Sequence, residues 1–174
     1  MAEEIQTEGE GQIKAMVTIA GNPVLSTPNG QQLDKALTGL EFMVSVDLYI
    51  NETNRHADVI LPTTSPLEHD HYDLIFNIFG VRNQAKYSAA TLPKPEGSLD
   101  DWELMDRLAV CYGTKIGKPA RPSMPPQMIL DMGLQMGPYG TQSTVGLSLE
   151  KLKAHPEGID LGPLKPRFPA RLMN

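Results

Sequence analysis

A short apolar run near the start of the chain predicts the first strand of a sheet. In "IKAMVTIA" (13–20) apolar side chains fall on both sides of an extended backbone, which is typical of a strand buried on both faces of a parallel sheet. The run stops at Gly21-Asn22-Pro23, because proline has no N–H to donate and glycine permits unusual backbone angles.

The pattern then switches between helical and strand periods. Asn29 is a candidate helix N-cap, and the apolar residues that follow it have helical spacing: Leu33, Ala36, Leu37 and Leu40. A second buried strand is predicted over 41–50, a short helix over 51–57 and a third strand over 57–62, where Pro62 ends it. This order of strands and helices predicts an α/β domain with a mostly parallel sheet.

The remainder of the chain is less regular. Residues 63–100 predict an excursion of irregular strand and turn. A helix is expected to begin at Asp100 or Asp101 and to end at Gly113, with an apolar face of Trp102, Met105, Leu108, Ala109 and Tyr112. Residues 114–174 are rich in proline and glycine and predict an irregular extension, with helices near 127–136 and 148–154. Residues 1–12 predict a disordered or artificially added lead.

Charge and composition exclude several classes of protein. The net charge of −6 and the lack of a Lys/Arg cluster argue against a general nucleic-acid surface. Cys111 is the single cysteine, so the chain holds neither an internal disulfide nor a cysteine-rich metal or iron–sulfur site, and its spacing predicts a buried helical position. There is no apolar run of about 20 residues for a membrane span and no signal peptide at the start, which favours a cytoplasmic protein.

Candidate chemistry centres on acidic side chains. Asp47 and Asp58 lie at predicted strand ends, where a carboxylate either accepts hydrogen bonds from a ligand or caps a turn. Glu68, His69 and His71 lie in the polar stretch "EHDHYD", which either binds a divalent metal or is a solvated loop. We find no G-x-G-x-x-G, P-loop or G-x-S-x-G motif in the sequence.

Four blocks together resemble one family. They are "IKAMVTIAGNPVLSTPN", "LEFMVSVDLYINETNRHADVILPTTSPLEHDHYD", "VRNQAKYS" and "DDWELMDRLAVCYG". In this order and at these separations, over roughly 13–113, they resemble the molybdopterin oxidoreductases, the family of bis(molybdopterin guanine dinucleotide) enzymes. "GIDLGPLKPRFPARL" (158–172) resembles the linker that leads into the C-terminal cofactor-binding domain of that family.

The resemblance implies a fold and a set of site residues. It implies a Rossmann-like three-layer domain over 13–113 that grips the guanosine end of the cofactor, and a linker over 114–174. The implied cofactor-binding residues are Gly21, Asn22, Pro23, Val46, Asp47, His69, Asp100 and Asp101. His69 stands where some relatives carry a lysine, and Asp100 and Asp101 compete for one position. A carboxylate suits guanine, which offers two adjacent N–H donors that adenine lacks.

The resemblance also implies what lies outside this chain. Family members carry molybdenum or tungsten on the cofactor, an iron–sulfur cluster and further domains, so we expect this chain to be an internal piece of an oxidoreductase. The remaining domains would be its partners, and alone it would be inactive and without bound cofactor. Two alternatives stay open: a free-standing subunit of a split oxidoreductase, or an unrelated metal-binding α/β protein that uses Glu68, His69 and His71.

Overall fold

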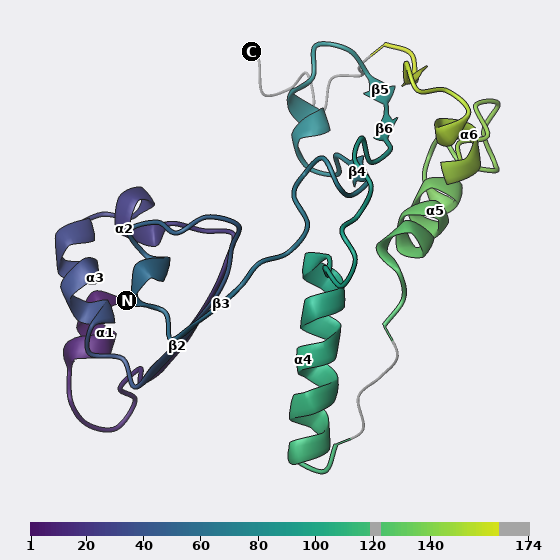
Figure 1. The fold of residues 1–174 in the computed structure, drawn as a ribbon. Coiled ribbons are helices and arrows are strands. Elements are labelled where there is room, and N and C mark those ends of the chain that lie inside the picture. The colour runs from purple at the N-terminus through teal and green to yellow at the C-terminus, as the bar shows by residue number, and fades with distance from the viewer. Residues whose placement is uncertain (119–122, 164–174) are drawn as a thin grey trace, which may run out of the picture. The chain divides into compact units, whose positions relative to one another are not determined.

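The structure divides the chain into two units. The computed structural model describes residues 1–118 and 123–163 (Figure 1). The first unit comprises Met1–Ser65 and Lys94–Leu108, and the second comprises Pro66–Pro93 and Ala109 onward. This division differs from the predicted boundaries at residues 12 and 113, because each unit is built from two separate stretches of the chain.

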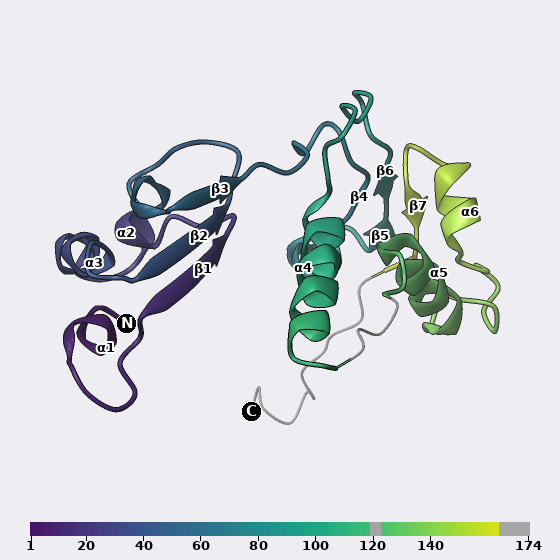
Figure 2. The ribbon, with the colours of Figure 1, turned by 60° about the horizontal axis from the view of Figure 1, so that its bottom comes forward.

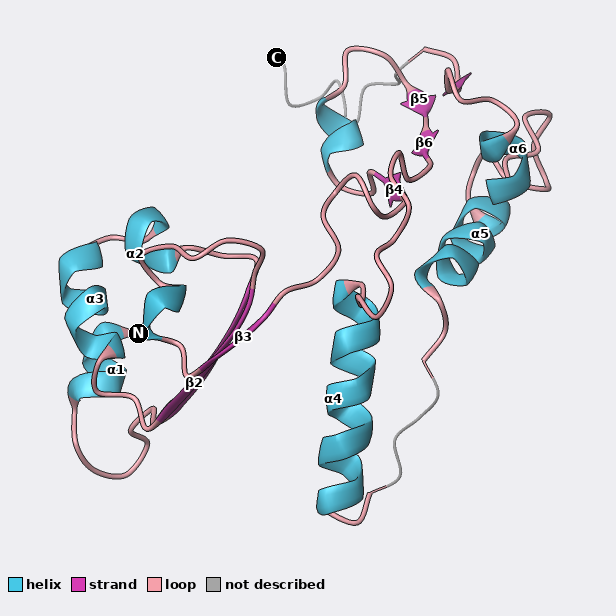
Figure 3. Ribbon diagram, in the orientation of Figure 1, coloured by secondary structure: helices cyan, strands magenta, loops and turns pink. Residues whose placement is uncertain are grey.

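The first unit is a small α/β domain with helices and strands in alternation (Figure 3). In chain order its elements before residue 65 are α1 (Ala2–Gln6), β1 (Ala15–Ile19), α2 (Pro23–Ser26), α3 (Gly30–Leu37), β2 (Phe42–Val46), the 3₁₀ helix η1 (Asn54–His56) and β3 (Val59–Leu61). The strands form one parallel sheet in the order β1-β2-β3. The predicted α/β class, its three strands and their parallel pairing are therefore confirmed.

One face of this sheet carries the core of the first unit. Met43 on β2 is 1% exposed and packs with Leu33, Ala36 and Leu37 of α3, whose spacing predicted that face. Figure 2 shows α1, α2 and α3 on one side of the three strands. The prediction that β1 is buried on both faces is wrong, because Val17 and Ile19 on its other face are 58% and 48% exposed.

The first residues of the chain belong to this core. Helix α1 places Ile5 against α3 with 2% of its surface exposed. The Ile13 N–H donates to the Glu4 carbonyl at 2.9 Å, which joins α1 to the start of β1. Of the two alternatives predicted for residues 1–12, disorder does not describe residues 2–6, because Ile5 of this helix packs into the core.

Helix α4 (Asp101–Lys115) begins where the sequence predicted and ends later. Gly113 lies inside the helix, and the residue in the left-handed conformation is Gly117 (φ 69°). Lys118 and Gly117 donate to the carbonyls of Gly113 and Thr114 at 2.8 and 3.3 Å, which is the Schellman pattern of a helix end. Cys111 is exposed, so the prediction of a buried cysteine is wrong.

The second unit has a core of its own. Its elements are β4 (His71–Tyr72), the 3₁₀ helix η2 (Phe76–Phe79), β5 (Gln84–Ala85), β6 (Tyr87–Ser88), α5 (Pro126–Met136), α6 (Leu149–Lys153) and β7 (Ile159–Asp160). Strands β4 and β6 pair antiparallel, and so do β5 and β7. Leu134 and Leu152 of the two helices pack with Ala85 and Tyr87 of the strands.

This second core corrects the expectation of an irregular extension after residue 113. Both predicted helices are present, and β7 returns to pair with a strand some 75 residues earlier in the chain, Gln84 opposite Asp160 and Ala85 opposite Ile159. Proline and glycine here mark turns between packed elements, not an unfolded linker. Most of the stretch 158–172, which resembles the linker of the family, lies outside the described residues, from residue 164 onward.

Among the helices that the structure describes, none combines the length and the apolar character that crossing a membrane requires.

Candidate functional site

The carboxyl ends of the three parallel strands meet at one edge of the first unit's sheet. Ile19 is opposite Val46, and Val46 is opposite Leu61, so the loops after β1, β2 and β3 leave the sheet side by side. Edges of this kind are where open α/β sheets bind ligands, because loop side chains and backbone groups converge there. We refer to these three loops as the carboxyl edge.

The loop after β1 turns sharply at Ala20. Its φ of 47° is left-handed, and the Ala20 N–H donates to the Val46 carbonyl at 2.9 Å. A residue with a Cβ pays roughly 1–2 kcal/mol for this conformation. The glycine predicted to relax the turn, Gly21, has no such angle, so the strain falls one residue earlier than the sequence indicated.

Asn22 links this loop to the loop after β2. Its side-chain oxygen accepts from the hydroxyl of Thr53 at 2.7 Å, and its Nδ2 donates to Glu52 at 2.7 Å. The Thr53 hydroxyl also accepts from the backbone N–H of Val24 in α2 at 3.0 Å. The hydrogen bond from Asn22 is the main cause that lowers the pKa of Glu52, so this carboxylate stays charged at the edge.

Asp47 is the first residue after β2, and its carboxylate is held by its own loop. One oxygen accepts from the Leu48 N–H at 2.7 Å, and the other accepts from Nδ2 of Asn51 at 2.9 Å. The Asn51 oxygen in turn accepts from the N–H groups of Thr53 and Asn54 at 3.0 Å. Asn54 is fully buried and completes this ring of hydrogen bonds through the Asn51 N–H and the Tyr49 carbonyl.

The loop after β3 holds the third acidic residue. Thr64 is 4% exposed, and its hydroxyl donates to Asp100 at 2.5 Å while its N–H donates to the Leu99 carbonyl at 3.0 Å. Lys94 lies 3.1 Å from the other Asp100 oxygen and also pairs with Glu103, whose pKa is lowered chiefly by the hydrogen bond from Lys94. The following residue, Asp101, starts α4 with an exposed side chain.

These contacts bring most of the predicted site residues to one edge. Gly21, Asn22 and Pro23 follow β1, Asp47 follows β2, and Asp100 is bound to the loop after β3. Val46 is 1% exposed, so only its backbone faces the loops, and its carbonyl already accepts from Ala20. Of the two competing aspartates, Asp100 is held in place by Thr64 and Lys94, whereas Asp101 presents its carboxylate to solvent.

His69 belongs to the second unit, whereas the elements that build this edge belong to the first. Its neighbour Asp70 accepts hydrogen bonds from the Tyr87 hydroxyl, the Gln127 amide and the Ala90 N–H, the last at 2.9 Å. Across the described residues, no three His, Cys, Asp or Glu side chains gather so that they could hold a metal ion. A metal site built on Glu68, His69 and His71 therefore has no geometric support.

Sequence reasoning missed the residues that join these loops. Asn51, Thr53 and Asn54 carry the hydrogen bonds between Asn22 and Asp47, and Glu52 adds a carboxylate to the edge. The available signal was the run "NETN" directly after a buried strand. Four polar residues in that place indicate a side-chain network that satisfies the loop backbone, because such loops lack partners of their own.

Comparison with known proteins gives the family of this α/β chain. Residues 1–110 match the family model "Molybdopterin oxidoreductase", which covers the first unit and the start of the second. The chain belongs to the molybdopterin oxidoreductase family, as the resemblance of its four sequence blocks implied.

Its relatives are subunits of much longer oxidoreductases. It is 34% identical over 111 residues to the assimilatory nitrate reductase catalytic subunit of Bacillus subtilis, and 29% identical over 114 residues to the F420-dependent formate dehydrogenase subunit alpha of Methanocaldococcus jannaschii, each match covering 64% of this chain. The NADPH-Fe(3+) oxidoreductase subunit alpha of Geobacter sulfurreducens matches 91% of this chain at 27% identity. The chain spans 15–18% of the length of these three relatives.

Proposed function

We propose that the first unit binds the guanosine end of a molybdopterin guanine dinucleotide at the carboxyl edge, as a Rossmann-like domain of a molybdenum or tungsten oxidoreductase. One observation supports this proposal above all others. Each oxygen of the Asp47 carboxylate accepts one hydrogen bond from its own loop, and the side chain remains partly exposed.

The number of free hydrogen-bond acceptor positions on the Asp47 carboxylate fits guanine. An ionised carboxylate has about four acceptor positions, so two of them remain for a ligand after the bonds from Leu48 and Asn51. Guanine presents N1–H and its exocyclic amino group side by side, and charge-assisted pairs of this kind are among the stronger hydrogen bonds. Because Asp47 is already oriented, a nucleotide would lose little free energy in ordering it.

Backbone donors near the same edge suit the phosphates of the nucleotide. The N–H groups of Gly21 and Asn22 donate to no other group in the part of the chain that the structure describes. The Asn22 amide is fixed by Thr53 and Glu52, so the loop is ordered before any ligand arrives. Pro23 has no N–H and contributes shape alone.

The two aspartates at the start of α4 have different roles in this proposal. Asp101 would offer its exposed carboxylate to the ribose or base, and Asp100 would hold the start of α4 through Thr64. The resemblance also implied a contact from His69, a residue of the second unit, and that contact stays a prediction. When bound, the cofactor supplies two-electron chemistry at its metal, and the residues of this chain bind and orient its nucleotide end. The other domains of the longer enzyme would supply the metal ligand and the redox partner.

The test is an NMR titration of the isotope-labelled chain with GDP and, separately, with ADP. We expect GDP to shift the amide signals of Gly21, Asn22 and Asp47, because these groups would contact the ligand or its neighbours. ADP should shift them much less, since adenine lacks the paired donors. Asp47→Asn should weaken GDP binding about tenfold or more, because one acceptor becomes a donor and a charge-assisted hydrogen bond is worth about 1.5–3 kcal/mol.

Glu41→Gln is the matched control. Glu41 precedes β2 at the opposite end of the same strand and forms an exposed ion pair with Lys14, so its loss removes the same charge far from the carboxyl edge. Asp101→Asn tests the proposed contact of Asp101 with the ribose or base, and His69→Ala tests the predicted contribution of His69. Equal shifts with ADP, or equal affinity of Asp47→Asn and Glu41→Gln for GDP, would contradict the proposed guanine contact.

A further inference from the structure

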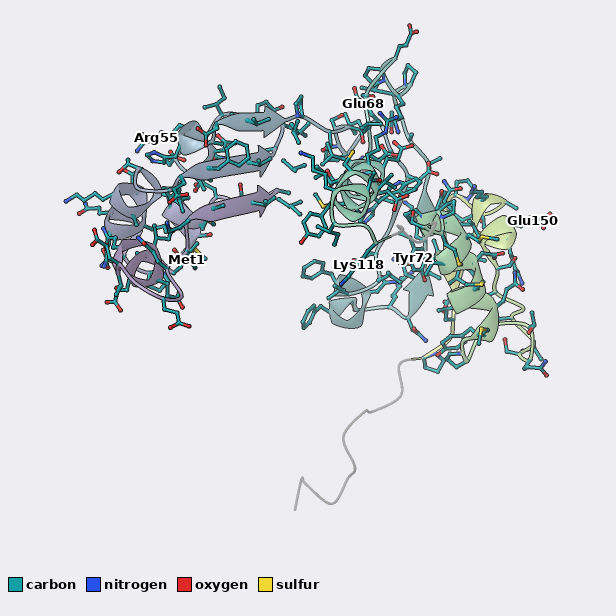
Figure 4. The ribbon with its side chains drawn as sticks, turned by 90° about the horizontal axis from the view of Figure 1, so that it is seen from below. Met1, Arg55, Glu68, Tyr72, Lys118 and Glu150 are labelled. Carbon is teal, nitrogen blue, oxygen red and sulfur yellow. The ribbon has the colours of Figure 1, made fainter. Side chains whose placement is uncertain are left out.

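Helix α5 of the second unit carries a row of methionines on its exposed surface. Met128, Met132 and Met136 follow one another at intervals of four residues, and they are 56%, 45% and 86% exposed. Side chains four residues apart lie one above the other on the same face of a helix. Figure 4 shows yellow sulfur atoms along the green ribbon of α5. Three thioether groups are therefore neighbours on an open face of this helix.

The core of the second unit does not account for these methionines. The side chains of α5 that pack into that core are leucines, Leu130 and Leu134. Leucine and methionine are close in volume and replace each other readily in protein cores. Of the four large apolar side chains that α5 exposes, three are nevertheless methionine and one is Ile129. What distinguishes the exposed row from the buried one is therefore sulfur.

The surroundings of the row leave the sulfur atoms accessible. Asp131 is the one charged residue of α5, and its carboxylate accepts from the Leu149 N–H of α6 and from the Gln135 amide, both at 2.8 Å. A Cβ on Gly133, three residues before Met136, would meet nothing within 4 Å, so the helix surface there is open. The net charge of −6 favours the approach of a cation.

Thioether sulfur is a soft and uncharged metal ligand. Soft ligands of this kind select Cu(I), whereas Mg²⁺ and Ca²⁺ require oxygen ligands. Residues four apart in a helix are about 6 Å apart along its axis. The methionine side chain has three rotatable bonds, so neighbouring sulfur atoms in the row can turn toward one ion. A thioether has no proton to lose, so metal binding by methionine alone is independent of pH, unlike binding by cysteine or histidine.

We propose that Met128, Met132 and Met136 form a binding site for one Cu(I) ion. Met132 is its central ligand, because it has a methionine neighbour on each side along the helix. The site lies within the second unit, shares no residue with the carboxyl edge and requires no nucleotide. Its test is therefore independent of the test of the proposed cofactor site.

The first measurement is a titration of the full chain with Ag(I), a soft cation of the same charge that keeps its oxidation state. It uses NMR of ¹³C-labelled methionine methyl groups in a Cys111→Ser background, because Cys111 is exposed and its thiol would also bind the ion. We expect the methyl signals of the three methionines of α5 to shift together and to saturate at one ion per chain. The signal of Met43, which is 1% exposed, should stay unchanged, and Mg²⁺ should shift none of them.

A matched pair of variants tests the arrangement of the sulfur atoms. Met132→Leu removes the central thioether, whereas Met124→Leu removes one that is 41% exposed and precedes the helix. The Cu(I) affinity of each is measured without oxygen by competition with the chelator bicinchoninate. We expect Met132→Leu to weaken binding about tenfold or more, since even residues that only orient metal ligands change affinity by about 10–100-fold when they are lost. Met124→Leu should leave the affinity almost unchanged.

The same measurements can overturn the proposal. Equal affinity of Met132→Leu and Met124→Leu, or no saturation at one Ag(I) per chain, would show that the row is merely an apolar surface. Backbone amide signals away from α5 should coincide in the two variants, so that a loss of folding is recognised as such. An affinity that falls tenfold between about pH 8 and pH 6, where histidine gains its proton, would assign the ion to another ligand and refute a site of thioethers alone.

Discussion

Thr53 offers the most direct perturbation of the carboxyl edge. It is fully buried, and its hydroxyl accepts from the Val24 N–H at 3.0 Å and donates to the Asn22 oxygen at 2.7 Å. Val24 lies in the first turn of α2, where backbone N–H groups have no partner within the helix. Thr53→Val keeps the shape of the side chain and removes both hydrogen bonds.

The expected loss of stability follows from these two bonds. A typical hydrogen bond contributes about 1 kcal/mol net, and a buried group left without a partner costs about 1–3 kcal/mol. Val24 N–H would be left without its partner, whereas the partly exposed Asn22 can bind water and keeps its bond to Glu52. We therefore expect Thr53→Val to lower the free energy of unfolding of the first unit by about 2–3 kcal/mol.

The assay is urea unfolding followed by methyl NMR signals from each unit separately. Met43 reports on the core of the first unit and Leu152 on that of the second, since they are 1% and 0% exposed. With a denaturant dependence of about 1–3 kcal/mol per molar urea, the loss corresponds to a midpoint lower by about 1 M for Met43. The midpoint for Leu152 should stay unchanged.

Thr38→Val is the control for this substitution. Its hydroxyl is exposed and donates to the Lys35 carbonyl at 2.7 Å at the end of α3, so water can replace the lost contact. A loss below about 0.5 kcal/mol is expected there. If Thr53→Val were no more destabilising than Thr38→Val, the hydrogen bonds of the Thr53 hydroxyl would not be what joins the loops after β1 and β2.

Two further predictions concern the same unit. Gly30→Ala should cost about 2–3 kcal/mol in unfolding free energy, because the new Cβ would lie 1.9 Å from the Val24 carbonyl oxygen and would force α2 and α3 apart. Hydrogen bonds from Arg55, labelled in Figure 4, and from His56 lower the pKa of Asp34 in the folded chain. The stability that these bonds contribute is therefore complete above the unfolded-state pKa of about 4. It is lost as the pH falls through the lower pKa of the folded state. Asp34→Asn should therefore flatten the fall in stability of the first unit below that pH, measured by urea unfolding at a series of pH values.

Each of these predictions has its own check within the first unit. A Cβ on Gly21 would come no closer than 3.6 Å to the Ile19 carbonyl oxygen, so Gly21→Ala should fold almost as stably as the unchanged chain. Equal losses for Gly30→Ala and Gly21→Ala would contradict the close approach of α2 and α3. An unchanged pH profile in Asp34→Asn would show that Arg55 and His56 contribute no stability through that carboxylate.

The hydrophobic pattern by itself determined the parallel sheet and its order along the chain. Apolar runs at 13–20, 41–50 and 57–62 are too short for helices and too continuous for exposed strands, and the structure has β1, β2 and β3 within them. The spacing of Leu33, Ala36 and Leu37 likewise identified the buried face of α3. Local periodicity reports these features because each depends on side chains only a few residues apart.

Only the tertiary structure decided which segments share a core. Ile5 lies in a polar stretch of sequence and is buried because it packs against the apolar face of α3. Ile159 pairs with Ala85, which lies far earlier in the sequence of the second unit. The same holds for the candidate site, where Thr53 joins Asn22 to the loop of Asp47 and Thr64 holds Asp100. Such contacts form between residues 31 to 76 positions apart, and their free energy depends on distances that no local sequence pattern encodes.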